Sequence, residues 1–528
     1  MSMITLGKWR RRAWWTYPVL VFFLVGFAWA LSNPPGAAPD EPSHFVRVIG
    51  MGRGQIVGGK LADDTKTGPF PPEQLIRINR EAGYFTSPGS LPEPDPCNAF
   101  NLAKPFACPQ PKAVAGTITQ ISFHAKYLPL PYIVPGILSR LGSTTWRALF
   151  AGRIGFLLQD TVFAGVIIGA IARRQRSLDG VGVSLLLISA TPLVGFLAGT
   201  LAPSGTEILS TVAFAASFAA AVATRSSRWW WISATMGVCA CWSRDLGAPL
   251  AAFFGILALV LYPDSRRWVA QRFRSRDVYA VVIVIVAAIG ATIWQAIFKD
   301  PGTPKWQGFN QLWLDIGQVP QMLIDSIGLI GWVDVQTDPL LKHLWEIAWL
   351  VTIAVAVARA TPKLRAIFAS LVFVYVVANL YIIYSLRAVG FGDQARFTLA
   401  IPLGAAVLLA MESTGTGNWG WFRVTALVAA FGQFSTMLLN AHRHANGEAV
   451  AIDFKHVAWS PPGGWTFSLV LYVVIALMIL WPAALPYRRS SATDRPPILD
   501  PSDQTPVDSI NRATTVDPAD RDEDLIPI

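Results

Sequence analysis

A succession of long apolar stretches is the feature that most constrains how this 528-residue chain can fold. A helix that crosses the roughly 30 Å hydrocarbon core of a bilayer needs about 20 mostly apolar residues. We identify twelve stretches that approach this length, and they are residues 17–32, 148–171, 181–201, 206–224, 229–243, 247–262, 278–298, 344–359, 366–386, 397–412, 423–440 and 466–485. The chain is therefore predicted to cross a membrane many times.

Composition and stretch length both favour helices over strands. Only 14% of the residues are charged and 53% are hydrophobic, whereas about 25% of a soluble chain is charged. Helices and closed barrels alone satisfy every backbone group in lipid, and these stretches are too long and too uniformly apolar for barrel strands. We predict an all-α polytopic membrane protein with about twelve transmembrane helices and a large first extracytoplasmic loop.

Basic residues predict the orientation of the spans. Groups of them precede the first span and follow the second, fourth, sixth, eighth and twelfth, which places every group on one side of the membrane. They are Lys8, Arg10, Arg11, Arg12, Arg173, Arg174, Arg176, Arg225, Arg228, Arg266, Arg267, Arg272, Arg274, Arg276, Lys363, Arg365, Arg488 and Arg489. Cytoplasmic loops are enriched in such residues, so we expect a multi-pass protein of the cell membrane with both termini in the cytoplasm. The net charge of +10 is then explained by the membrane topology. The basic residues are scattered over many loops and form no single patch, which argues against nucleic-acid binding.

The chain divides into three predicted regions. Residues 1–16 form a basic cytoplasmic N-terminus, residues 17–485 the transmembrane domain, and residues 486–528 an acidic cytoplasmic tail. The tail is poor in aromatic residues and is predicted to be disordered. A cleaved signal peptide is the alternative for the first apolar stretch. That stretch lacks a small-x-small cleavage site followed by a soluble domain, which favours a retained span.

Residues 33–127 are the longest polar stretch and the first outer loop under this topology. The loop is too long to be a plain connector. Two cysteines in an oxidising compartment predict a disulfide between Cys97 and Cys108, with two free thiols as the alternative. Cys239 and Cys241 lie inside an apolar stretch and cannot complete a four-ligand zinc site alone, so we predict that they are packing residues.

An acidic pair, Asp40 and Glu41, follows the first span by a few residues. A carboxylate there can take the proton of a hydroxyl group or hold a divalent cation. The alternative is a helix N-cap, because acidic side chains match the helix dipole. His44 lies three or four residues farther on, where it would share a helical face with the pair. It could orient a carboxylate or contact a phosphate, or it could be an ordinary interfacial histidine.

Arg396 is the main candidate for binding a lipid phosphate at the same side of the membrane. Its guanidinium carries a planar fork of donors that suits phosphate oxygens. The alternative is an arginine that extends to the headgroup region. His124 and Lys126 are further candidates of the same kind.

Other polar residues are predicted to be structural. Arg153 and Asp160 lie seven residues apart on one helical face, which favours an intramembrane pair. Arg244 and Asp245 are predicted to pair at a turn. An outer segment could bind a metal, but its spacing fits no tight site and a solvated loop is favoured. The residues of that segment are His442, His444, Asp453 and His456.

Several motifs together resemble one family. The segment 39–45, Pro-Asp-Glu-Pro-Ser-His-Phe, looks like the Pro-Asp-Glu-Pro-x-His-Phe signature of the DUF2142 family of predicted membrane proteins. Weaker landmarks follow in the same order: 128–132 resembles a Pro-Leu-x-Tyr stretch, 331–334 a Gly-Trp-Leu-Asp stretch that ends at Asp334, and 395–397 a Gly-Arg-Tyr-Phe stretch. The resemblance covers about residues 10–485.

That family is similar to the GT-C glycosyltransferases, multi-span enzymes that typically use polyprenyl-phosphate sugars. The resemblance implies a hexosyl- or pentosyltransferase that moves a sugar from a polyprenyl-phosphate donor to a glycan or lipid acceptor of the cell envelope. It implies catalytic roles for Asp40 and Glu41, which could also hold Mg²⁺ or Mn²⁺. Substrate-binding roles are implied for His44, His124, Lys126, Asp334 and Arg396.

The sequence departs from the family pattern at a few positions. Ala395 and Phe397 replace the usual Gly and Tyr, and Ser204 stands where relatives often carry Asp. These changes affect the expected donor or acceptor contacts. Two other functions fit a chain of about twelve spans: a transporter or lipid flippase, or a non-catalytic membrane assembly protein. Few charges are predicted at the bilayer midplane and no internal repeat is evident, which disfavours the transporter.

Overall fold

We analysed a computed structural model of the chain, which describes residues 3–62, 65, 78–175, 180–298, 308–387, 394–413 and 419–485. The chain forms two compact units, residues 1–484 and 485–528, and the first of them is described here. The acidic tail predicted at 486–528 lies outside the described residues, and so do residues 390–393, which precede the segment that carries Arg396.

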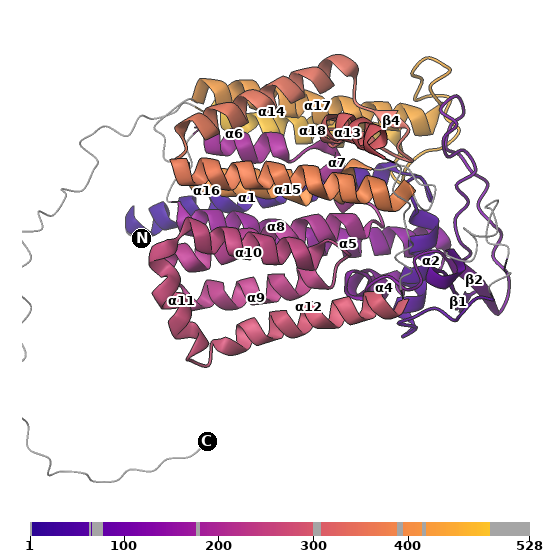
Figure 1. Ribbon diagram of the computed structural model, residues 1–528. Coiled ribbons are helices and arrows are strands. Elements are labelled where there is room, and N and C mark those ends of the chain that lie inside the picture. The colour runs from indigo at the N-terminus through magenta and orange to yellow at the C-terminus, as the bar shows by residue number, and fades with distance from the viewer. Residues whose placement is uncertain are drawn as a thin grey trace, which may run out of the picture. The chain divides into compact units, whose positions relative to one another are not determined.

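Helices dominate the first unit (Figure 1). Among the described residues, eight helices are long and apolar enough to cross a membrane: α1 (Met3–Ser32, apolar from Trp15), α5 (Thr145–Arg174), α8 (Pro203–Thr224), α12 (Val278–Phe298), α14 (Pro339–Arg359), α15 (Pro362–Arg387), α17 (Trp419–Ala445) and α18 (Gly464–Ala484). The chain is thus an all-α polytopic membrane protein.

Two bent helix pairs raise the number of candidate spans among the described residues to at most ten. In the first pair, α6 (Gly180–Ser189) and α7 (Pro192–Ala198) meet at 56°. In the second, α10 (Gly247–Leu261) and the segment Pro263–Phe273, which contains α11 (Arg266–Phe273), meet at 97°. The remaining apolar stretches form α9 (Ser227–Cys241) and α16 (Ala400–Met411), which are shorter. Every predicted stretch therefore overlaps a helix, but twelve is not confirmed as the number of spans.

Helix α8 lies at the centre of the packing. It contacts α5, α9, α10 and α16. In its most apolar stretch of 18 residues, 89% is buried. Its sequence is rich in alanine and serine, and small side chains let helix backbones approach closely in a membrane protein. By contrast, only 11% of the most apolar 18-residue stretch of α12 is buried. The valine and isoleucine side chains of α12 are therefore exposed on the outside of the helix bundle.

Most of the short elements gather at one end of the helix bundle, which we call the site end (Figure 1). They include α2 (Glu41–Gly52), the antiparallel pair β1 (Gly83–Pro88) and β2 (Thr117–Ser122), the antiparallel pair β3 (Leu329–Ile330) and β4 (Val335–Gln336), and α13 (Phe309–Asp325). The arginine-rich helix α11 lies at the opposite end. The described elements of the loop 33–127 and the hairpin β3–β4 therefore share one end of the bundle.

Helix α2 is almost entirely buried, from Glu41 to Gly50, beneath the neighbouring short elements. It packs against β1, β2, α4 (Ile133–Ser139) and α5. A Cβ atom on Gly52 would lie 2.2 Å from the backbone oxygen of Gly136, so α2 and α4 meet where neither carries a side chain. In the same loop region, Cys97 and Cys108 form a disulfide, while Cys239 and Cys241 are free.

Candidate functional site

Asp40 occupies the N-cap position of α2 in an uncommon backbone conformation. Its φ is 60°, in the left-handed region, and its side chain makes no capping hydrogen bond. Left-handed backbone costs roughly 1–2 kcal/mol for an ordinary residue, although aspartate tolerates it better than most. The carboxylate accepts a hydrogen bond from Arg396 Nη2 at 2.8 Å instead. Asp40 is thus at the N-cap position, as the alternative predicted, but its side chain binds Arg396 and caps no backbone N–H group of the helix.

Glu41 has a different environment, although it is the next residue. Glu41 and Arg153 are both 0% exposed and form a two-pronged ion pair, with Nε to Oε1 at 2.8 Å and Nη2 to Oε2 at 2.6 Å. The backbone amides of Gly36 and Leu201 donate to the same carboxylate. Both oxygens of Glu41 are thus fully engaged.

Arg153 also joins α5 to the end of α1. Its guanidinium donates to the backbone oxygens of Ala30, Asn33 and Pro34 at 2.9, 2.6 and 3.0 Å. These carbonyls lie where α1 ends, and helix ends leave carbonyls without partners inside the helix. The predicted Arg153–Asp160 pair is wrong, because Asp160 accepts from Thr206 Oγ1 and Arg153 turns to Glu41.

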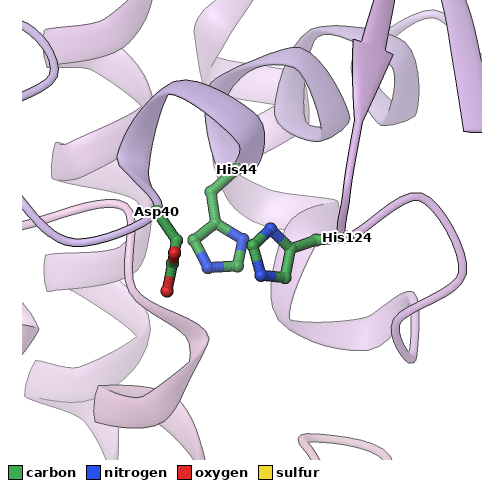
Figure 2. Close-up of side chains that lie close together, drawn as sticks. All are labelled: Asp40, His44 and His124. Carbon is green, nitrogen blue, oxygen red and sulfur yellow. The ribbon is translucent and has the colours of Figure 1, made fainter. Parts of the chain in front are cut away.

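Two histidines lie beside Asp40, His44 from the first turn of α2 and His124 from the loop after β2 (Figure 2). Their ring centroids are 4.0 Å apart. Each Nδ1 has a hydroxyl partner: Tyr132 Oη lies 2.9 Å from that of His44, and Ser43 Oγ lies 2.8 Å from that of His124. One potential ligand atom from each of Asp40, His44 and His124 lies within 4.8 Å of the others.

Arg47 supports this cluster from one turn farther along α2. It is 0% exposed and donates to the backbone oxygens of Ile56, Ala125 and Tyr127. Two of these carbonyls flank His124 in sequence, so Arg47 fixes the loop that carries the imidazole. Sequence reasoning missed Arg47. Its position three residues after His44, on the same helical face, is the signal that could have found it.

The electrostatics of the cluster follow from burial and from nearby arginines. Burial raises the pKa of the Asp40 carboxyl, but Arg396, His124 and Arg244 outweigh that effect, so the pKa lies below its ordinary value. Burial lowers the pKa of His124 to about 4 despite Asp40, and lowers that of His44 well below its ordinary value. At neutral pH the site therefore holds one carboxylate and two uncharged imidazoles.

Arg396 connects the cluster to a small cavity. It belongs to the short 3-10 turn η3 (Ala395–Phe397) and lines the cavity with Pro39, residues of α7 and residues of the β3–β4 hairpin. The cavity is shallow and partly open, and its enclosed space holds about one water molecule. The lining includes Leu193, Phe196, Leu197, Leu329, Ile330, Gly331, Val333, Gln394 and Ala395. Asp40 and Arg396, 356 positions apart in the chain, thus meet at the cavity edge.

A second arginine, Arg244, stands near the first. Its Nη1 lies 2.7 Å from Ser204 Oγ and 3.7 Å from Glu207 Oε2, so the predicted turn pair with Asp245 is not its main contact. The guanidinium groups of Arg244 and Arg396 lie 5.1 and 5.3 Å from the centroid of the Phe397 ring. Ser204 and Phe397, two positions where the sequence departs from its family pattern, therefore both contact Arg244.

The other predicted substrate-binding residues lie in separate contacts. Asp334 pairs with Arg443 at 3.5 Å; Arg443 is buried and Asp334 is half-buried. The ammonium group of Lys126 donates to the backbone oxygen of Arg80. These two side chains are held by partners other than the Asp40 cluster.

The histidine-rich outer segment is dispersed in the structure. The Nε2 of His442 lies 2.9 Å from the Val450 backbone oxygen, while that of His444 lies 3.1 Å from Asn33 Oδ1. Within the described part of the chain, the ligand-atom geometry for a metal is met by the Asp40 cluster and not by this segment.

Comparison with known proteins gives one result. The model of the family described as "Predicted membrane protein (DUF2142)" matches residues 23–401. No curated protein and no solved structure matches the chain. Because the match spans well over half of the sequence, the chain belongs to the DUF2142 family of predicted membrane proteins.

Proposed function

We propose that this protein is a membrane glycosyltransferase that moves a sugar from a polyprenyl-phosphate donor to an acceptor of the cell envelope. One observation carries the proposal: an ionised, 38% exposed carboxylate, Asp40, is held in a left-handed backbone conformation against an arginine that lines a cavity. Strained backbone and perturbed carboxylates concentrate at functional sites.

Asp40 would act as the general base. The acceptor hydroxyl loses its proton to the carboxylate as its oxygen forms a bond to the anomeric carbon. The bond from that carbon to the phosphate oxygen breaks, and its electron pair leaves with the polyprenyl phosphate. Attack opposite the leaving group inverts the anomeric centre. Arg396 would stabilise the charge that develops on the phosphate, because its fork of donors matches phosphate oxygens.

Glu41 receives a positioning role in this proposal. Its carboxylate is enclosed by Arg153 and two backbone amides, and it has no exposed surface. It holds the start of α2, and so fixes Asp40. A Mg²⁺ or Mn²⁺ ion shared by Asp40 and Glu41 does not fit this arrangement, because both Glu41 oxygens already have donors.

The apolar rim of the cavity suits surface contact with part of such a donor, although its enclosed space is too small to contain an isoprenoid chain. Leu193, Phe196 and Leu197 of α7 line one side, and the β3–β4 hairpin lines another. An isoprenoid chain gains about 25 cal/mol for each Å² of apolar surface that leaves water. The arginine at the cavity edge would then meet the phosphate, where the isoprenoid ends.

Turnover by the purified protein tests the proposal. With radiolabelled polyprenyl-phosphate sugars and a cell-envelope extract as acceptor, we expect Asp40→Asn to lower transfer by about 100- to 10,000-fold, the usual contribution of a general base. The thermal midpoint in detergent should stay close to that of the wild type. Asp453→Asn is the matched control, because Asp453 pairs with His456 in an exposed loop. Wild-type transfer by folded Asp40→Asn would refute the proposed base.

Transport is a second candidate, favoured by the broken pair α6–α7. Helices interrupted inside the bundle are typical of transporters, whose substrates bind at such breaks. Here α7 also lines the cavity. Uptake of polyprenyl-phosphate sugar into proteoliposomes without formation of a new glycosidic bond would favour transport over transfer.

A further inference from the structure

We propose that Asp40, His44 and His124 bind one divalent transition-metal ion (Zn²⁺, Mn²⁺, Fe²⁺ or Co²⁺). The ligands would be one carboxylate oxygen and two imidazole nitrogens. This inference rests on the proposed function for its place beside the donor phosphate, and it changes one role in it. With Oδ1 on the ion and Oδ2 on Arg396, Asp40 would act as a ligand of the ion and not as the base. The inference is nevertheless tested by binding, without turnover.

The three side chains already converge. Asp40 and His44 stand four residues apart at the start of α2, which places them on one face, and His124 approaches from the loop after β2 (Figure 2). Their ligand atoms lie within 4.8 Å of one another. Ligands at about 2.0–2.2 Å from one ion are separated by roughly 3–4 Å. Small side-chain rotations would therefore complete the site.

The hydrogen bonds around the cluster occupy one polar atom of each side chain and leave the other to bind an ion. Metal-binding histidines usually engage their second ring nitrogen with a polar group, which fixes the ring. Here the Tyr132 hydroxyl lies 2.9 Å from His44 Nδ1, and the Ser43 hydroxyl 2.8 Å from His124 Nδ1. Both Nε2 atoms remain as ligands. Arg396 holds Oδ2 of Asp40, which leaves Oδ1.

The donor set selects the class of ion. Two imidazoles and one carboxylate suit Zn²⁺, Mn²⁺, Fe²⁺ or Co²⁺, whereas Mg²⁺ and Ca²⁺ prefer oxygen ligands alone. Three nearby arginines oppose a cation. Arg396 faces Asp40 and Arg244 faces Glu207, whereas Arg47 donates to three backbone oxygens, so its charge is the main one that the ion would have to overcome. Three protein ligands leave positions open for water or a phosphate oxygen.

Cobalt provides a direct probe of these ligands. Purified protein, stripped with a chelator, should take up about one equivalent of Co²⁺ with a visible absorption band, and Zn²⁺ should displace it while Mg²⁺ should not. His44→Ala and His124→Gln should each weaken Co²⁺ binding by about 10-fold or more. His456→Ala is the control and should bind as the wild type does, because His456 lies in an exposed loop.

Each result decides the inference. Absence of Co²⁺ binding, or equal binding by the wild type and by folded His124→Gln, would overturn it. Thermal unfolding in detergent identifies a variant that fails to fold, and the conservative His124→Gln then carries the test. If Co²⁺ binds but no sugar is transferred, the metal site stands and the proposed function fails. If sugar is transferred but no Co²⁺ binds, the proposed function stands and the metal site fails.

Discussion

The two carboxylates at the start of α2 occupy opposite environments although they are adjacent in sequence. Glu41 is 0% exposed and bound by an arginine fork and two backbone amides. Asp40 is 38% exposed and held by one arginine beside a cavity. The left-handed turn at Asp40 separates the two side chains. The difference shows how one short motif can supply both a structural anchor and a reactive group.

The largest effect on stability should come from the Glu41 side. Glu41→Ala leaves Arg153 buried without its counter-ion, and breaking a buried pair in this way costs about 3–5 kcal/mol. We expect a large fall in the thermal midpoint and in yield from membranes. The double variant Glu41→Leu/Arg153→Leu removes both charges and should recover part of that loss. A Glu41→Ala protein as stable as Asp40→Asn would erase the distinction between the two carboxylates.

On the Asp40 side, Arg396→Lys should change activity more than stability. Lysine keeps the charge but loses the planar fork that can hold Asp40 and a phosphate together. We expect transfer to fall by about 10- to 100-fold, which corresponds to roughly 1.4–2.7 kcal/mol of activation free energy. The measurement is kcat and KM for the donor, with Arg365→Lys at an exposed site as the control. If the thermal midpoint falls as far as in Glu41→Ala, Arg396 belongs to the anchor instead.

A third carboxylate of the same loop region, that of Glu93, should have the smallest effect on stability, and this effect depends on pH. Its environment can be compared with that of Asp40. Burial raises the pKa of Glu93 to about 7, whereas the pKa of Asp40 lies below its ordinary value because of its arginine. Between pH 4.5 and about 7 the folded state keeps a proton that the unfolded chain has lost. Stability should therefore decrease as pH rises through this window.

The pH effect can be isolated with Glu93→Gln. This variant should flatten the dependence of the thermal midpoint on pH in the same window, while Glu448→Gln in another loop should leave it unchanged. A wild-type midpoint that rises with pH there would contradict the assigned sign.

The sequence was sufficient to predict the helices but not how they break. Hydropathy identified each apolar stretch, because burial in lipid requires long apolar runs. The 56° bend between α6 and α7 depends on Thr191 and Pro192 and on tertiary contacts, including the bond from Thr191 Oγ1 to Ser326 O. The mean hydropathy of a stretch carries no information on such contacts. The sequence therefore predicted twelve spans, whereas the described residues contain at most ten candidate spans.

The candidate site was predicted in part for the same reason. Local spacing was enough to associate Asp40 with His44 on one helical turn. The partners Arg396 and Arg153 lie 356 and 112 positions from the acidic residues they bind, and no local pattern encodes those distances. The Arg153–Asp160 prediction was wrong because periodicity identifies a shared face but not which neighbour covers it.

The Glu41–Arg153 pair also has a consequence for biogenesis. An arginine inside an apolar helix is costly to insert, by about 2.5–3.5 kcal/mol near the helix centre. Arg153 lies in the long apolar helix α5, and Glu41 precedes it by 112 positions. Its counter-ion and the three carbonyls at the end of α1 are thus synthesised before the arginine emerges from the ribosome. Chain order alone therefore allows the second long apolar helix to pack against the first before the six to eight later candidate spans of the described residues are synthesised.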